Sequence, residues 1–190
     1  MNTTEFQEKQ ERIASLIDGK VVPDTGRVAV SVKGVLDGFP ATFEAFQPTW
    51  PFGVMYTVET NVVVDPNEPD NRPVGKIQVY PRMGRGFFTI FTRILLFEAK
   101  GQPVSNRKLE KQFNFNYDER VIAERFINHP GVAEIIEELD YHAKFSELVI
   151  KTDVGVYLAQ PTNFNALELE TCKATFDGLA ELAEVLFEGF

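Results

Sequence analysis

The fold of this chain is organised around Phe87–Phe97, a run that reads FFTIFTRILLF and is the longest apolar stretch in the sequence. As a strand, the run places mostly apolar side chains on both of its faces, because successive strand residues point to opposite sides of a sheet. Both faces therefore need cover. The sequence predicts a central strand with packed layers on either side, or with a partner subunit on one side.

Shorter segments with alternating side chains surround this run. Consecutive hairpins followed by helices predict an α+β fold: a mainly antiparallel sheet, formed by a meander of about six strands plus a C-terminal hairpin, with helices packed on it. Residues 1–190 are expected to form one domain, with an N-terminal helix inside residues 1–20 at its periphery. Besides 87–97, we predict strands at about 28–36, 39–46, 54–64, 74–80, 109–117, 145–152 and 155–160, and helices at 4–18, 118–128, from Pro130 onward and at 166–188.

Several local features refine these elements. Asp37-Gly38 is a suitable hairpin turn, because glycine tolerates the positive φ that a type I′ turn requires. In the strand predicted at 109–117, Leu109 is expected to face inward together with the aromatic residues that follow it. The next helix is expected to use Asp118 as its N-cap, and the helix after that to place Pro130 in its first turn.

Charge is unevenly distributed along the chain, whose net charge is −9. The segment 72–111 holds nine basic residues against two acidic ones, which gives it +7 and leaves −16 for the rest. A net negative protein is a poor nonspecific binder of nucleic acid, so we expect no nucleic-acid partner. The late helices carry acidic stripes, which predicts that they lie near basic residues of the 72–111 segment, in the same copy or in a second one.

The compartment and the relation to the membrane follow from composition. Cys172 is the only cysteine, which indicates a small core hydrophobe in a reducing compartment. The N-terminus lacks the basic and apolar regions of a signal peptide. Phe87–Phe97 is far shorter than the ~20 residues of a membrane helix and contains Arg93. We therefore expect a cytoplasmic protein without stable membrane insertion.

Residues 109–188 resemble a group of uncharacterised bacterial proteins. The resemblance rests on an aromatic strand, Phe113–Tyr117, followed by an acidic-capped helix with Arg125-Phe126 near its end, a Pro-started helix, a β-hairpin and a terminal helix. These proteins have no assigned activity, so the resemblance implies the order of elements but no functional residue.

Catalytic motifs are absent from the sequence. His129 and His142 lack metal-ligand spacing, and each is expected to pack, cap or lie in solvent. Nothing beside Cys172 would activate its thiol, and the chain contains no nucleophile elbow, phosphate loop or dinucleotide fingerprint. We expect no cofactor. A hydrolase-type enzyme using carboxylates or His129 is the least supported reading.

The turn Arg82-Met83-Gly84-Arg85-Gly86 is the best candidate ligand site. Its glycines let backbone N–H groups converge on an anion, and Arg82 and Arg85 can grip a phosphate or carboxylate. Lys76 and Tyr80 share the strand face that leads into this turn. The competing interpretation is a hairpin turn whose arginines neutralise acidic helices or another subunit.

The loop that contains Trp50 and Phe52 is a second candidate, either as an interface or as a lid folded onto the core. The polarised charge and the two-faced strand favour a non-enzymatic interaction or assembly protein, with itself or another protein as partner. The alternative is a binding module for a small anion or acidic ligand at Arg82 and Arg85.

Overall fold

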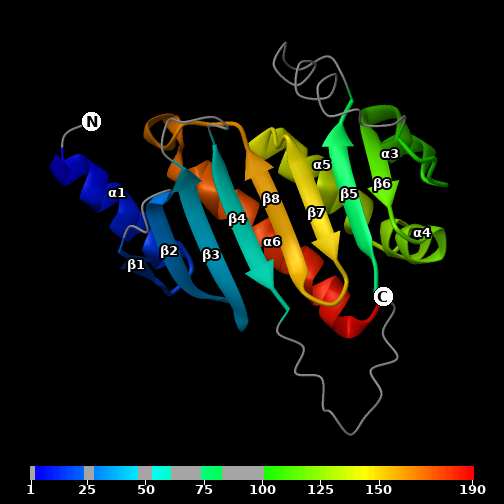
Figure 1. The fold of residues 1–190 in the computed structure, drawn as a ribbon, viewed down its shortest axis with the longest axis horizontal. Coiled ribbons are helices and arrows are strands. Elements are labelled where there is room, and N and C mark those ends of the chain that lie inside the picture. The colour runs from blue at the N-terminus through cyan, green and yellow to red at the C-terminus, as the bar shows by residue number, and fades with distance from the viewer. Residues whose placement is uncertain (1–2, 24–27, 47–52, 61–73, 83–100) are drawn as a thin grey trace, which may run out of the picture.

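A computed structural model describes residues 3–23, 28–46, 53–60, 74–82 and 101–190 of the chain (Figure 1). Several residues singled out in the sequence lie outside these ranges, and their predicted roles remain predictions: the strand Phe87–Phe97, Trp50 and Phe52 of the predicted interface, and Gly84 and Arg85 of the predicted anion site.

The described residues form one antiparallel sheet of eight strands, in the order β1-β2-β3-β4-β8-β7-β5-β6. The α+β fold with an antiparallel sheet is therefore confirmed. The strands are β1 Lys20–Val22, β2 Val28–Leu36, β3 Phe39–Phe46, β4 Val54–Glu59, β5 Lys76–Pro81, β6 Phe113–Tyr117, β7 Glu147–Lys151 and β8 Gly155–Gln160. The helices are α1 Thr3–Leu16, α3 Arg107–Gln112, α4 Arg120–Ile127, α5 Val132–Ala143 and α6 Leu169–Glu188, with a 3₁₀ turn at Phe164–Ala166.

The first half of the sheet follows the chain, and the second half does not. β2, β3 and β4 pair in the predicted order, and β1, which was not predicted, pairs with β2 at the edge of the sheet. The β2–β3 turn has positive φ at Asp37 (49°) and Gly38 (88°), as a type I′ turn requires. The C-terminal hairpin then inserts between β4 and β5: β8 pairs with β4, and β7 pairs with β5. A simple six-strand meander with an appended hairpin is therefore not the observed strand order.

Three local predictions are corrected by the structure. Residues 107–112 form helix α3 rather than the start of a strand, because Asn106 accepts hydrogen bonds from the backbone N–H groups of Lys108 and Leu109 and so caps a helix. Asp118 does not cap α4, which begins after Glu119. Pro130 precedes the first turn of α5, whose N-cap is Gly131 with φ 87°.

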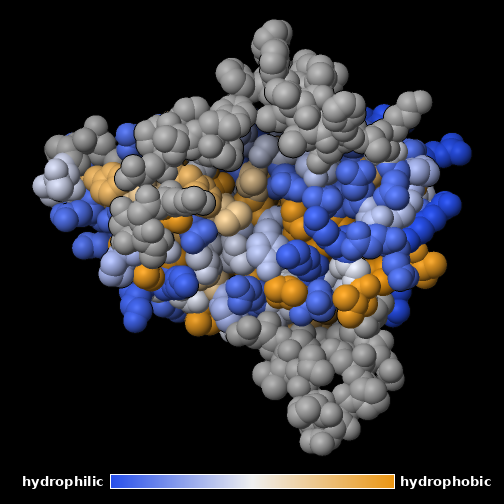
Figure 2. Space-filling model, viewed as in Figure 1, coloured by the Kyte–Doolittle hydropathy of each residue, from blue (hydrophilic) through white to orange (hydrophobic). Residues whose placement is uncertain are grey.

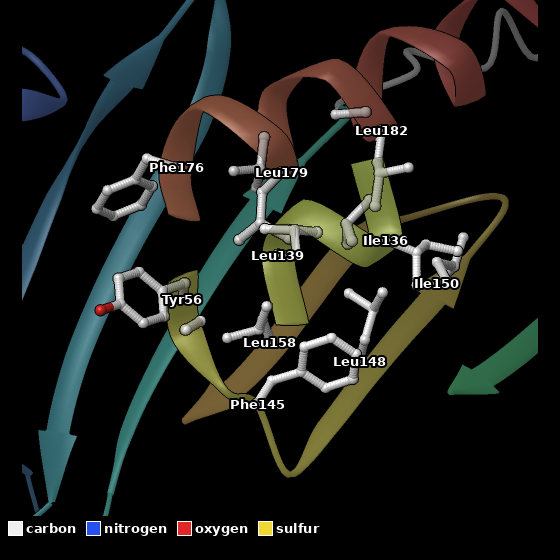
Figure 3. Packing of buried hydrophobic residues seen from close by; sticks show 14 of the residues in the cluster. Tyr56, Ile136, Leu139, Phe145, Leu148, Ile150, Leu158, Phe176, Leu179 and Leu182 are labelled. Carbon is white, nitrogen blue, oxygen red and sulfur yellow. The ribbon is translucent and has the colours of Figure 1, made fainter. Parts of the chain in front are cut away.

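The core lies on one side of the sheet. The strands appear in front of α5 and α6 in Figure 1, and side chains from both helices meet those of the sheet in Figure 3. Leu139 of α5 and Leu179 of α6 lie close together above Leu148 and Leu158 of the central hairpin, and all four are at most 1% exposed. The predicted apolar stripes of the late helices therefore form this contact with the sheet.

The N-terminal helix is attached through a close backbone contact. The Val35 N–H donates to the carbonyl of Ile17 at 2.7 Å, immediately after α1. A Cβ atom at Gly34 would lie 2.0 Å from that carbonyl oxygen and 2.6 Å from the Gly19 Cα. Only a residue without a side chain permits this approach of the α1–β1 turn to β2.

Candidate functional site

The sheet has a second surface on which none of the described helices lies, and we call it the helix-free face. In β7, Leu148 and Ile150 are fully buried toward the helices, so Glu147, Val149 and Lys151 point to the opposite side. Figure 2 views this face and shows a mostly hydrophilic surface with scattered apolar patches. Cross-strand register places on it Lys20, Val22, Ser31, Lys33, Val35, Pro40, Thr42, Glu44, Met55, Thr57, Glu59, Lys76, Gln78, Tyr80, Asn114, Asn116, Glu147, Val149, Lys151, Tyr157 and Ala159.

A hydrogen-bonded cluster joins β7 and β5, the sixth and seventh strands of the sheet, on the helix-free face. Glu147 of β7 accepts two hydrogen bonds at the same carboxylate oxygen, from Gln78 Nε2 at 2.8 Å and from the Tyr80 hydroxyl at 2.9 Å. Both donors come from β5, the strand beside β7. Tyr80 is only 8% exposed. The cluster therefore fixes the Glu147 carboxylate relative to two strands.

A second group lies further along β7. The Lys151 ammonium sits 5.2 Å from the centre of the Tyr157 ring, within cation–π range. Partial burial raises the pKa of the Tyr157 hydroxyl, and the carboxylates of Glu59 and Asp153 raise it further. The hydroxyl therefore stays neutral and can serve as a hydrogen-bond donor at physiological pH.

Lys76 and Arg82, two described members of the predicted anion site, lie near opposite ends of β5. Lys76 opposes Lys151 across β5 and β7, whereas Arg82 follows the far end of β5, about 20 Å away at the rise of an extended strand. Arg82 Nε donates to the Phe113 carbonyl at 3.1 Å, and Tyr80 is hydrogen-bonded to a carboxylate, which would repel an anion. Anion binding at the Arg82 turn stays a prediction, because the rest of that turn lies outside the described residues.

Polar groups also meet inside the core, beneath the first turns of α6. The Tyr56 hydroxyl donates to Gln160 Oε1 at 3.0 Å and lies 3.6 Å from Cys172 Sγ. Burial raises the pKa of the Cys172 thiol to about 11, despite the hydrogen bond from Tyr56 and the nearby Lys9 ammonium, which both lower it. The predicted structural role of Cys172 is consistent with this position, since its thiol is fully buried and protonated.

The two histidines lie apart from any catalytic arrangement in the described part of the chain. His129 Nδ1 is 3.2 Å from the carbonyl oxygen of the adjacent Pro130, and exposed His142 packs edge-on against Tyr141. Across the described residues, no group of three or more His, Cys, Asp or Glu side chains is placed to hold a metal ion. No helix among those described has the length and apolarity to cross a bilayer.

One part of the basic segment does meet an acidic helix, as the charge distribution predicted. Lys108 of α3 and Glu137 of α5 form an ion pair of 2.5 Å, and Gln112 Nε2 donates to the other oxygen of the same carboxylate. This contact joins α3 to the helix layer, so it explains part of the charge asymmetry by internal pairing.

The sequence did not identify Glu147, Lys151 and Tyr157 as members of a common surface. Alternation in the predicted hairpin assigns Glu147 and Lys151 to one side of their strand, which was the available signal. The pairing of Glu147 with Gln78 and Tyr80 depends on insertion of this hairpin beside β5. Two segments about 70 residues apart become neighbours only through that topology.

Comparison of the chain with protein-family models, with curated proteins and with solved structures found no match. The resemblance of residues 109–188 to uncharacterised bacterial proteins accordingly stays a prediction.

Proposed function

We propose that this chain is a non-enzymatic interaction or assembly protein that docks another protein surface on its helix-free face. The observation that carries the proposal is the one-sided arrangement of the sheet: the described helices all pack on one surface and leave the other to side chains of the eight strands.

The dimensions of the face suit a protein partner. Eight strands spaced about 4.8 Å apart span roughly 34 Å, and strands of about six residues are roughly 20 Å long. The resulting flat area is on the order of 700 Å². Stable complexes commonly bury about 800 Å² on each partner, so the face is of the size that a specific interface needs.

An antiparallel sheet can also simply expose one face to water, so size alone does not favour docking. Fixed side chains do. The Glu147 carboxylate on this face is only half-buried, and two donors from β5 hold it in place. Side chains that are already ordered lose little conformational entropy when a partner binds.

A substitution on β7, an interior strand of the sheet, tests the proposal. Val149 is half-buried on the helix-free face, between Glu147 and Lys151, and Val149→Arg places a charge where a docked surface would exclude water. The matched control is Val121→Arg on α4, where the valine is 77% exposed on the helix layer.

Multi-angle light scattering over a concentration series measures self-association. The same method measures binding to a different protein if one is purified as a partner. We expect Val149→Arg to weaken association at least about tenfold with an unchanged melting temperature, and Val121→Arg to leave it intact. Association that is equally strong in both variants would refute docking on this face.

A further inference from the structure

We infer that the surface docked on the helix-free face is that of a second copy of this chain, related by a two-fold axis that passes over Val149. The inference rests on the proposed function and adds the identity of the partner and the geometry of contact.

Strand β7 supplies the main argument, because its outward side chains are self-complementary in charge. They are Glu147, Val149 and Lys151, with one acid and one base at equal distances from the central valine. Consider two copies whose helix-free faces point at each other, with a two-fold axis midway between the sheets that runs across the strands at the level of Val149. This axis lays β7 of the second copy over β7 of the first, in the opposite strand direction. It therefore places Lys151 of each copy opposite Glu147 of the other.

Sheet-packing geometry permits these contacts. Two sheets packed face to face lie about 10 Å apart, with strand directions within about 30° of each other. Lysine and glutamate side chains that point into this gap from opposite sides can meet. In such an isologous interface, the same pair forms twice, once on each side of the axis.

The local structure prepares both members of the pair. Glu147 uses one carboxylate oxygen for Gln78 and Tyr80, which fixes the group while the second oxygen takes no part in those bonds. The Lys151 ammonium rests over the Tyr157 ring and makes no ion pair within the described residues. Each copy thus presents a positioned acid and a base that has no carboxylate partner among the described residues.

The distribution of charge over the molecule also favours a second copy on this side. Helices α5 and α6 carry nine acidic residues against one lysine, so two helix layers repel each other. The strands of the helix-free face carry four lysines, Lys20, Lys33, Lys76 and Lys151, against three glutamates, Glu44, Glu59 and Glu147. Lys33 and Lys20 lie level with Val149 in the register, so the axis sets each of them opposite its own counterpart, and the favourable charge pairs are those of β7. Two acidic proteins can approach most closely through their nearly neutral surfaces.

Two charge reversals test the inference by complementation. E147K and K151E each place two like charges in the triplet, so each variant repels its own copies across the axis. Mixed together, the two variants restore opposite charges at both contacts. We expect each variant alone to associate at least about tenfold more weakly than the wild type, and the mixture to form a heterodimer within about threefold of wild-type affinity.

Lys173→Glu is the matched control, because it makes the same change of charge on α6, on the other side of the sheet. It should leave the dimer intact. Native mass spectrometry of the mixture distinguishes the heterodimer from the two homodimers. Circular dichroism melts establish whether both variants fold. If E147K lowers the melting temperature, the strength of self-association is compared only between K151E and Lys173→Glu.

Two results would overturn the inference. A wild-type chain that stays monomeric at every concentration excludes a second copy as the partner. If the K151E and Lys173→Glu proteins dimerise with the same affinity, this axis is excluded. If that dimer is still broken by Val149→Arg, docking on the helix-free face stands and only the geometry fails. If Val149→Arg also has no effect, the proposed function fails with it.

Discussion

Replacing Tyr56 with phenylalanine removes one buried hydroxyl and leaves the surrounding packing in place. Tyr56 is 0% exposed, and its ring meets Phe43 and Phe176 edge-on at centroid distances of 5.3 and 5.2 Å. Its hydroxyl donates to Gln160 Oε1 and lies against the Cys172 thiol. Because phenylalanine keeps the ring contacts, any change in stability reports on the polar cluster.

The magnitude follows from what the hydroxyl leaves behind. A protein hydrogen bond contributes a net ~1 kcal/mol, and a buried polar group deprived of its partner costs about 1–3 kcal/mol. Gln160 is only 5% exposed, so water replaces the lost donor poorly. We expect Tyr56→Phe to lower the free energy of unfolding by about 1–3 kcal/mol, which is less than the about 3–5 kcal/mol expected when the ring is removed as well in Tyr56→Ala.

Urea denaturation followed by far-UV circular dichroism measures this difference. The control is Tyr141→Phe, because that tyrosine is 75% exposed and the change should cost less than about 0.5 kcal/mol. A double-mutant cycle with Gln160→Leu isolates the contact: Tyr56→Phe should cost less when the acceptor is already gone. The reasoning would be refuted if Tyr56→Phe lowered the free energy of unfolding equally in the wild-type and Gln160→Leu proteins, or did not lower it in the wild type at all.

Three further predictions concern other parts of the fold. Partial burial favours the neutral form of the Glu124 carboxyl, but hydrogen bonds to the carboxylate from Ser105 and Asn128 outweigh it and lower the pKa. Urea titrations should therefore find Glu124→Gln less stable by about 1 kcal/mol at pH 7, with the difference lost as the pH falls through the folded-state pKa, below 4.5. Thermal melts should find Gly34→Ala less stable by about 1–3 kcal/mol, since its Cβ would collide with backbone, and an unchanged melting temperature would contradict that contact. The Cys172 thiol should react with a disulfide reagent at pH 8 only after unfolding in urea, and rapid reaction of the native protein would contradict its burial.

Periodicity identified most of the described elements because each has one buried face. The β2–β3 hairpin was predictable from alternating valines and phenylalanines around Asp37-Gly38, and α5 from its apolar stripe. In residues 107–112, alternation suggested a strand, but the segment consists of strong helix formers preceded by the capping residue Asn106. There, a local cap and intrinsic propensity outweighed a pattern extended from the true strand Phe113–Tyr117.

Strand order was the part of the fold that periodicity could not supply. A hairpin with one apolar face fits either at the edge of a sheet or within it, and the choice depends on which neighbours bury it best. Here β8 and β7 separate β4 from β5, so the two halves of the sheet meet only through residues near the C-terminus. The candidate site was unpredictable for the same reason, since the bonds from Gln78 and Tyr80 to Glu147 require this insertion.

The position of β7 inside the sheet, with a strand on each side, also separates stability from association along a single strand. Leu148 and Ile150 are fully buried and hold the helix layer, while Glu147, Val149 and Lys151 form the triplet of the helix-free face. Because adjacent residues point to opposite sides, a change at Leu148 alters mainly the free energy of unfolding, and a change at Val149 alters mainly the surface offered to a partner. Leu148→Ala should therefore change association only in proportion to the folded fraction. A Leu148→Ala protein that remains fully folded but loses its partner would mean that the two faces are coupled through the backbone of β7.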